Sequence, residues 1–95
     1  MYSVNISGYI PEQKLKEFKQ HMRLLVGQQN SDVVSFSVMQ DMINEDLYLV
    51  KVQFIDKESM FLFLKSEEYA MISGSFRTLG LLREKNIIEY TDLED

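Results

Sequence analysis

Few side chains in this sequence have the types and spacing that chemistry requires. His21 is the only histidine, and a lone histidine could act as a general base near neutral pH. It lies off the apolar stripe of its predicted helix, so a solvated helix flank is the better interpretation. Glu67 and Glu68 are adjacent acids, but neighbouring side chains on a helix point about 100° apart. Both acids are better explained by the positive end of a helix dipole than by paired acid–base catalysis.

Metal and phosphate chemistry have no support in the sequence. The chain contains no cysteine, and its histidine and carboxylates do not have metal-ligand spacing. The segment GSFRTLG, residues 74–80, lacks the Gly-Lys-Ser/Thr of a phosphate loop and does not follow a strand. The sequence therefore predicts no metal site and no cofactor, and it identifies no catalytic residue.

The stretch FLFLKSEEYAMISGSF, residues 61–76, is the best candidate for ligand contact. A buried tyrosine needs a hydrogen-bond partner and can orient a ligand, which favours Tyr69. Core packing is the competing interpretation, and it is strongest for Phe76. Small residues at 73–75 would allow close helix packing or widen a pocket. The predicted ligand-binding residues are Phe63, Tyr69, Ser73 and Phe76.

The same stretch cannot be one straight helix. On a helical wheel, its two apolar stripes are offset by roughly 90°. A break at Ser66 removes the conflict, because a serine N-cap followed by two acids starts a new helix well. We therefore predict helices over residues 57–65 and 67–79, the second ending at Gly80. The stripes are Met60, Phe61 and Leu64, and then Tyr69, Ile72, Phe76 and Leu79.

The short helix carries MFLFL and is apolar on nearly every side. A helix with that pattern is buried on more than one side. In so small a domain, a ligand or another chain would have to cover Leu62 or Phe63.

Alternating apolar residues predict four strands, over residues 2–10, 33–40, 47–55 and 86–92. A helix over 12–28 follows Pro11, QQNSD at 28–32 is a loop, and Asp56 can cap the helix that follows the third strand. The order β-α-β-β-α-β predicts an α+β, ferredoxin-like fold: a four-stranded antiparallel sheet with helices on one face. Residues 1–95 form a single domain.

The two faces of the predicted sheet differ in character. The helix-facing side is apolar: Tyr2, Val4, Ile6, Ile10, Val34, Phe36, Val38, Tyr48, Val50, Val52 and Phe54. The opposite side mixes serines with exposed apolar residues: Ser3, Asn5, Ser7, Tyr9, Val33, Ser35, Ser37, Met39, Leu47, Leu49, Lys51, Gln53 and Ile55. Such a mixture suits a sheet that packs on the sheet of an identical subunit. The competing interpretation is a monomer with a partly solvated sheet.

Charge and composition restrict the partners. Ten basic and 15 acidic side chains give a net charge of −5, and the basic residues are scattered, so nucleic acid is not an expected partner. The third predicted strand also lacks the glycine–aromatic pattern of RNA-binding modules with the same element order. No apolar stretch approaches the roughly 18 residues of a membrane span, and MYSVNIS does not resemble a signal peptide. We expect no membrane association and a cytoplasmic location, which the absence of cysteine fits.

The passage VKVQFIDKESMFLFLKSEEYAMI, residues 50–72, resembles the antibiotic biosynthesis monooxygenase-like (ABM) domains. In those domains a strand leads into a short helix, a leucine-lysine-serine turn with an acid and an aromatic residue, and a second helix. The length and element order agree over essentially the whole chain. The resemblance implies a homodimeric α+β barrel, with two four-stranded sheets face to face, and a pocket between sheet and helices in each subunit.

The family includes haem-degrading enzymes, cofactor-free oxygenases of aromatic polyketides and quinol oxygenases. The residues of the haem-degrading branch are missing here. Aligned through the leucine-lysine-serine turn, the branch's tryptophan falls on Phe63 and its iron-ligating histidine on Ser73. The helix-facing position of the first strand is Ile6, and Asn5 faces the other side. Haem degradation by that mechanism is not expected.

Two functions follow from the resemblance and its departures. The first is an ABM-like protein that binds an apolar or aromatic small molecule, as a cofactor-independent monooxygenase. The alternative is a non-catalytic dimeric ligand-binding or structural module of the same fold. The sequence does not decide whether the chain is an enzyme.

Overall fold

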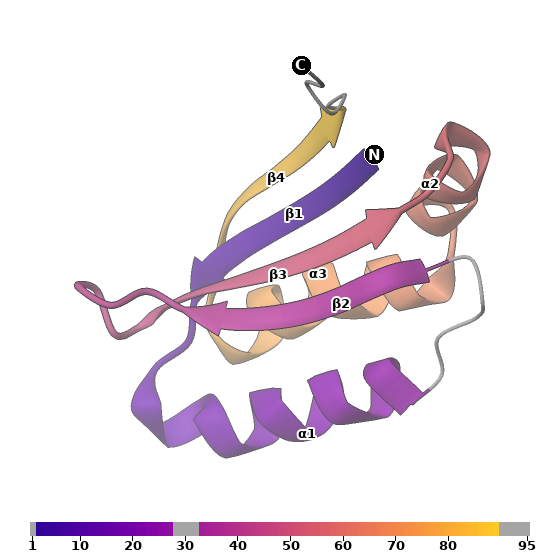
Figure 1. Ribbon diagram of the computed structural model, residues 1–95. Helices are drawn as coiled ribbons and strands as arrows, with labels where there is room; N and C mark the ends of the chain where they lie inside the picture. The colour runs from indigo at the N-terminus through magenta and orange to yellow at the C-terminus, as the bar shows by residue number, and fades with distance from the viewer. Residues whose placement is uncertain (1, 28–32, 90–95) are drawn as a thin grey trace.

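The computed structural model describes residues 2–27 and 33–89 and contains one sheet with its helices on one side (Figure 1). The elements follow the predicted β-α-β-β-α-β order, with the second helical region divided in two and a short 3-10 helix before the first. In chain order they are β1 (Tyr2–Tyr9), η1 (Glu12–Lys14), α1 (Leu15–Gly27), β2 (Val33–Gln40), β3 (Leu47–Phe54), α2 (Lys57–Leu64), α3 (Glu67–Leu79) and β4 (Leu81–Glu89).

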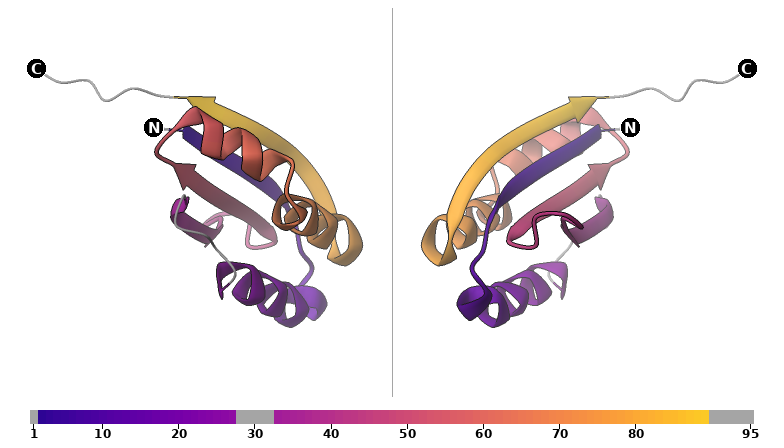
Figure 2. Two further views of the ribbon diagram at one scale, coloured as in Figure 1. Left: turned by 90° about the vertical axis from the view of Figure 1, so that its right-hand side faces the viewer. Right: turned by 90° about the vertical axis from the view of Figure 1, so that its left-hand side faces the viewer.

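The sheet has the strand order β2-β3-β1-β4, and every neighbouring pair is antiparallel. The chain therefore returns to pair its last strand with its first, as in the split βαβ arrangement. Figure 2 shows the strong twist of this sheet and the opposite face left without a helix. The predicted α+β ferredoxin-like fold is confirmed.

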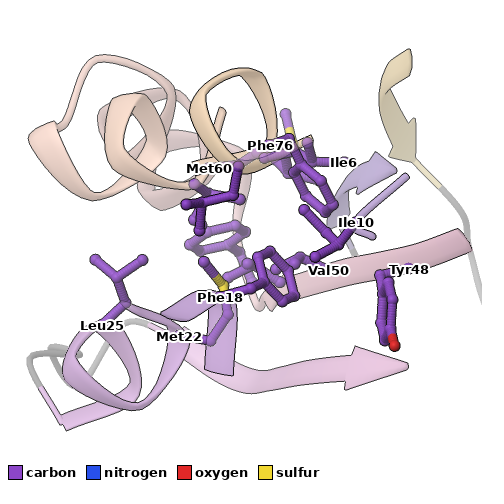
Figure 3. Close-up of a cluster of buried hydrophobic side chains, with 14 residues drawn as sticks. Ile6, Ile10, Phe18, Met22, Leu25, Tyr48, Val50, Met60 and Phe76 are labelled. Carbon is purple, nitrogen blue, oxygen red and sulfur yellow. The ribbon is translucent and has the colours of Figure 1, made fainter. Parts of the chain in front are cut away.

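The core lies between the sheet and the helices (Figure 3). Alternate residues of β1 and β3 enter it, as the strand periodicity predicts. From the helices, Phe18, Met60 and Phe76 are completely buried. The buried hydrophobic side chains are Val4, Ile6, Ile10, Phe18, Met22, Leu25, Tyr48, Val50, Val52, Phe54, Met60, Ile72, Phe76 and Leu79.

Strand β2 corrects the predicted faces at its start. Its register against β3 shifts between Val33 and Ser35, so the backbone bulges there. A bulge adds one residue and reverses the alternation. Val33 therefore pairs with Phe54 and packs against the core, whereas Val34 is 51% exposed. The prediction had the two valines on the wrong faces.

The last strand begins at Leu81, five residues earlier than predicted. The charged run Arg83-Glu84-Lys85 hides it in the sequence, because charges are unusual in a buried strand. At the edge of a sheet, charged residues are common. Gly80 permits the abrupt start: a Cβ there would collide with the backbone of Tyr9. Residues 90–92 of the predicted strand, and the predicted loop 28–32, lie outside the described residues.

The break between α2 and α3 is confirmed. The Asp56 carboxylate accepts a hydrogen bond from the Ser59 amide at 2.7 Å and begins α2. This bond holds the pKa of Asp56 below its usual value. The Ser66 hydroxyl accepts from the Tyr69 amide at 3.2 Å and begins α3. The helix boundary lies where the two misaligned stripes required it.

The buried face of α2 differs from the prediction. Met60, Phe63 and Leu64 pack on the core, and Phe61 is 46% exposed. The Phe63 ring is half-buried against the rings of Phe54 and Tyr69, so its packing does not require another chain. Leu62 is 62% exposed. The short helix is therefore one-sided, and its outward apolar residues face solvent in the single chain. Among the described residues, no helix is long and apolar enough to cross a membrane.

Candidate functional site

Three aromatic rings meet where β3, α2 and α3 come together. The Phe63 ring lies 5.2 Å from that of Phe54 and 5.7 Å from that of Tyr69, the second contact being edge-to-face. Such contacts favour a fixed ring geometry. Phe54 is buried, whereas Phe63 and Tyr69 are half-buried. The pair therefore keeps ring surface that another molecule could contact.

Ser66 fixes the positions of the two helix ends that carry the half-buried rings of Phe63 and Tyr69. Its hydroxyl donates to the Phe63 carbonyl at 2.6 Å and accepts from the Tyr69 amide at 3.2 Å. One side chain thus caps the end of α2 and the start of α3 at the same time. The turn that carries the family resemblance positions both aromatic side chains.

Lys85 completes this group, and the sequence did not reveal it. Its ammonium nitrogen lies 5.1 Å from the centre of the Tyr69 ring, within cation–π distance. Lys85 pairs with Ile6 across β1 and β4, which places it on the helix side of the sheet. The predicted strand starts at residue 86, so Lys85 falls in a loop before it. A strand that starts at residue 81 contains Lys85, and its alternation indicates which face of the sheet Lys85 lies on. We call Phe54, Phe63, Tyr69 and Lys85 the aromatic–lysine cluster.

The other two predicted ligand residues lie deeper. Ser73 is buried and its hydroxyl donates to the Tyr69 carbonyl one helical turn earlier, at 3.2 Å. Phe76 is fully buried and its ring lies 5.0 Å from that of Phe18. The structure therefore brings Phe63 and Tyr69 together, with Ser73 behind Tyr69 and Phe76 in the core. Gly74 does not mediate close helix packing, because a Cβ there would meet nothing within 4 Å.

The position that the resemblance assigns to an iron-ligating histidine does not fit haem. A serine side chain has no nitrogen atom that could bind iron. Ser73 is also buried, and its hydroxyl is hydrogen-bonded within α3. Within residues 2–27 and 33–89, no group of three or more histidine, aspartate or glutamate side chains could hold a metal ion.

His21 is not a solvated flank. It is half-buried on α1, and its Nδ1 lies 3.0 Å from the Ser75 hydroxyl of α3. Ser75 is itself buried. The contact joins two helices across the core and is best explained as a polar link between them.

The open face of the sheet carries a cavity of about 300 Å³ near the β2–β3 hairpin. Apolar side chains of β2 and β3 form part of its wall, together with an arginine from β4. Its lining residues are Ser7, Met39, Gln40, Asp41, Leu47, Tyr48, Leu49 and Arg83. At the other end of β3, Ile55 is also exposed. This face remains apolar in patches, as the sequence predicts for a surface that pairs.

Solved structures with the same fold were found for the whole chain. A conserved protein from Methanosarcina mazei is 17% identical, with a TM-score of 0.74, over 92% of this chain and 87% of its own. A candidate antibiotic biosynthesis monooxygenase from Deinococcus radiodurans is 12% identical, with a TM-score of 0.75, over 100% and 95%. Another from Nitrosomonas europaea is 12% identical, with a TM-score of 0.72, over 99% and 100%.

No family model and no curated relative matches the sequence. At these identities the structural matches establish the fold and not the activity. The chain therefore has the fold of these antibiotic biosynthesis monooxygenase-like proteins, which is the fold that the sequence resemblance implies.

Proposed function

We propose that the chain binds a small hydroxylated aromatic molecule at the aromatic–lysine cluster. The observation that carries this proposal is the Lys85 ammonium, 5.1 Å from the centre of the half-buried Tyr69 ring, beside Phe63. The ring surface of Phe63 and Tyr69 would stack on the ligand, and Lys85 would favour its ionised hydroxyl. Phe63 and Tyr69 contribute the wall, Ser73 lies behind Tyr69, and Phe76 supports the wall from the core.

The activity best supported for such a ligand is cofactor-independent monooxygenation. A quinol supplies all the electrons that reduce O₂: one oxygen atom enters the ring, and the other leaves as water. The protein then has to bind the substrate, exclude water and stabilise the phenolate by electrostatics. The cluster offers an apolar wall and one cation for these tasks.

The alternative function is ligand binding without catalysis. Its support is the make-up of the cluster, which holds no carboxylate and no imidazole that could move a proton. Under this alternative, the same aromatic molecule binds and leaves unchanged.

Oxygen uptake with a panel of dihydroxy-aromatics, together with calorimetric binding of the same compounds, tests both functions. For the monooxygenase, we expect uptake above the buffer control, with a loss of about tenfold in Lys85→Met. Tyr69→Phe should retain the stacking and lose any hydroxyl contact. Lys16→Met, an exposed lysine on α1, is the matched control. Binding with no uptake would favour the non-catalytic module, and no binding would reject the site.

We also propose that two chains pair through the open sheet face. The support is the exposed or half-buried apolar surface of Met39, Leu47 and Leu49, and the dimeric arrangement that the family resemblance implies.

Light scattering tests this pairing and should give twice the 11.2 kDa of one chain. Leu49→Asp should yield monomers, because it places a charge in the contact. Leu24→Asp, exposed on α1, is the control, and a monomeric wild type would refute pairing.

A further inference from the structure

A second cavity, of about 230 Å³, lies between α1 and the β2–β3 side of the sheet. Helix α1 does not close over this edge, because Val38, on the helix-facing side of β2, is still 40% exposed. The lining combines apolar side chains with the polar groups of Lys19, Gln40 and Tyr48. It consists of Leu15, Phe18 and Lys19 from α1, Val38 and Gln40 from β2, and Tyr48 from β3.

Tyr48 provides a polar group in this cavity for which the described residues offer no hydrogen-bond partner. The residue is only 6% exposed, and its ring lies 5.7 Å from that of Phe18. Its hydroxyl points away from the other labelled core side chains (Figure 3). Among the described residues, it has no hydrogen-bond partner. Buried hydroxyls are nearly always paired, so a hydroxyl without a described partner at a cavity is a place where a water molecule or a ligand can bind.

The charges near Tyr48 are mainly negative. Glu45 and Asp46 precede it in the hairpin, and the Ile10 amide donates to the Asp46 carbonyl at 2.8 Å, which brings Glu12 to the same end of the sheet. Burial and the charges of Asp46, Glu45 and Glu12 all raise the pKa of Tyr48. The hydroxyl therefore stays protonated in a negative local potential.

The neighbouring helical segment, η1 and α1, also carries lysines. Lys19 lines the cavity but is exposed, and Lys14 is 3.7 Å from Glu17, with which it forms an ion pair. Three carboxylates, those of Glu12, Glu45 and Asp46, therefore stand against the one lysine of the lining. An anionic ligand would be repelled here, and a cationic one attracted.

We infer that the cavity between α1, β2 and β3 binds a small organic cation, an ammonium group on a compact apolar body. The body would lie among Leu15, Phe18 and Val38, and the ammonium would donate to the Tyr48 hydroxyl near the Phe18 and Tyr48 ring faces. The Gln40 amide nitrogen donates to the Glu45 carbonyl at 2.8 Å, which leaves the Gln40 side-chain oxygen as a second acceptor.

The size of the cavity limits the ligand. At about 30 Å³ of liquid volume per water molecule, it suits a molecule of roughly eight non-hydrogen atoms. The site is also separate from the aromatic–lysine cluster. Tyr48 and Phe54 lie near opposite ends of β3, about 20 Å apart at the usual rise per strand residue. The inference therefore does not depend on the proposed function.

Three probes that share a phenyl ring and differ in the charge of the polar group test the charge preference of the cavity. They are benzylammonium, benzyl alcohol and benzoate. Titration of the full chain, followed by ¹⁵N–¹H NMR, should show saturable shifts for benzylammonium at Leu15, Phe18 and Tyr48. Benzyl alcohol should bind about fivefold more weakly, and benzoate more weakly still. Equal or tighter binding of benzyl alcohol or benzoate would overturn the inference. So would shifts centred on Phe63 and Tyr69, or no saturation by about 10 mM.

Variants separate the hydroxyl from the charges. Tyr48→Phe should weaken benzylammonium about tenfold. Glu45→Gln should weaken benzylammonium but not benzyl alcohol, with Glu58→Gln on α2 as the control of equal charge change. Lys19→Met should tighten benzylammonium two- to threefold, roughly, since it removes the cation of the lining. Unchanged affinity in Tyr48→Phe, with the fold verified by circular dichroism, would refute the site.

Discussion

Tyr69 and Tyr48 lie in two regions on the helix side of the sheet, and their surroundings are nearly opposite. Tyr69 is half-buried on α3, touches Phe63 and has the Lys85 ammonium near its ring. Tyr48 is buried on β3, touches Phe18 and lies among acidic residues. One region offers an accessible aromatic wall with a cation, and the other a hydroxyl at a cavity with acidic residues near it.

The difference shows how one fold can build two kinds of site from the same side chain. Where a helix break leaves rings at the surface, tyrosine acts through its face. Where a helix stands away from an edge strand, tyrosine acts through its hydroxyl. The two proposed sites should therefore prefer ligands of opposite charge. A ligand with an ionisable aromatic hydroxyl would bind beside Lys85, and a ligand with an ammonium group would bind beside Tyr48.

Phe76→Ala should have the largest effect, because Phe76 lies between the two regions. Its ring contacts Phe18, which in turn contacts Tyr48, and α3 also carries Tyr69. Removing a fully buried phenylalanine should cost about 3–5 kcal/mol of unfolding free energy in urea titrations. A cost near 1 kcal/mol would mean that the core between the two regions is looser than the ring contacts indicate.

Gly80→Ala should disturb the Lys85 region more than the Tyr48 region. A Cβ at Gly80 would collide with the Tyr9 backbone, which cannot move aside as a side chain can. We expect a loss of about 1–3 kcal/mol in unfolding free energy and a displaced start of β4.

Gly74→Ala is the matched control for Gly80→Ala, since a Cβ at Gly74 meets nothing within 4 Å. It should stabilise α3 by about 0.5–1 kcal/mol. Equal effects of the two alanines would contradict the close contact at Gly80.

Ser66→Ala tests whether one hydroxyl positions the aromatic wall. The variant loses the N-cap of α3 and the bond to the Phe63 carbonyl. It should cost about 1 kcal/mol in thermal or urea unfolding. NMR shifts should move at Phe63 and Tyr69 and stay in place at Tyr48; movement at Tyr48 would show that the regions are coupled.

Tyr48→Phe should raise stability slightly, by up to about 1 kcal/mol, because it removes a buried hydroxyl that has no described partner. Tyr69→Phe, at a half-buried position, should change the unfolding free energy by less than about 0.5 kcal/mol. If Tyr48→Phe instead destabilises the protein, the hydroxyl has a partner and the contrast between the two tyrosines fails.

Alkaline pH sharpens the same contrast. The pKa of Tyr48 is raised above its ordinary value of 10.0, so the unfolded chain loses this proton first. The stability linked to Tyr48 is complete below pH 10.0 and is lost as the pH rises through the folded pKa. Unfolding free energies at about pH 9 and pH 11 should therefore fall more in the wild type than in Tyr48→Phe. Equal declines would contradict the raised pKa.

Much of the fold could be predicted from local patterns. The alternation in β1 and β3, the caps at Asp56 and Ser66, and the stop at Gly80 follow from short-range rules, and the structure confirms them. The errors occur where pairing overrides local preference. The β2 bulge exchanges Val33 and Val34, and β4 extends through a charged run because β1 provides its partner.

The candidate sites divide in the same way. Phe63 and Tyr69 could be predicted because their spacing around Ser66 is local. Lys85 could not, because its neighbour is 16 positions away and meets it only when β4 starts at Leu81. Tyr48 was predicted as a core residue, and its unpaired hydroxyl depends on how far α1 lies from β2.

Local sequence rules are enough to give the element order, the apolar faces of the central strands and the break at Ser66, because periodicity and capping act over a few residues. Only the tertiary structure decided which polar groups lie beside which rings. Those encounters join residues distant in the chain, and they depend on strand register and on the space a helix leaves at the sheet edge. For this protein, that space and that register set the chemistry of both tyrosines.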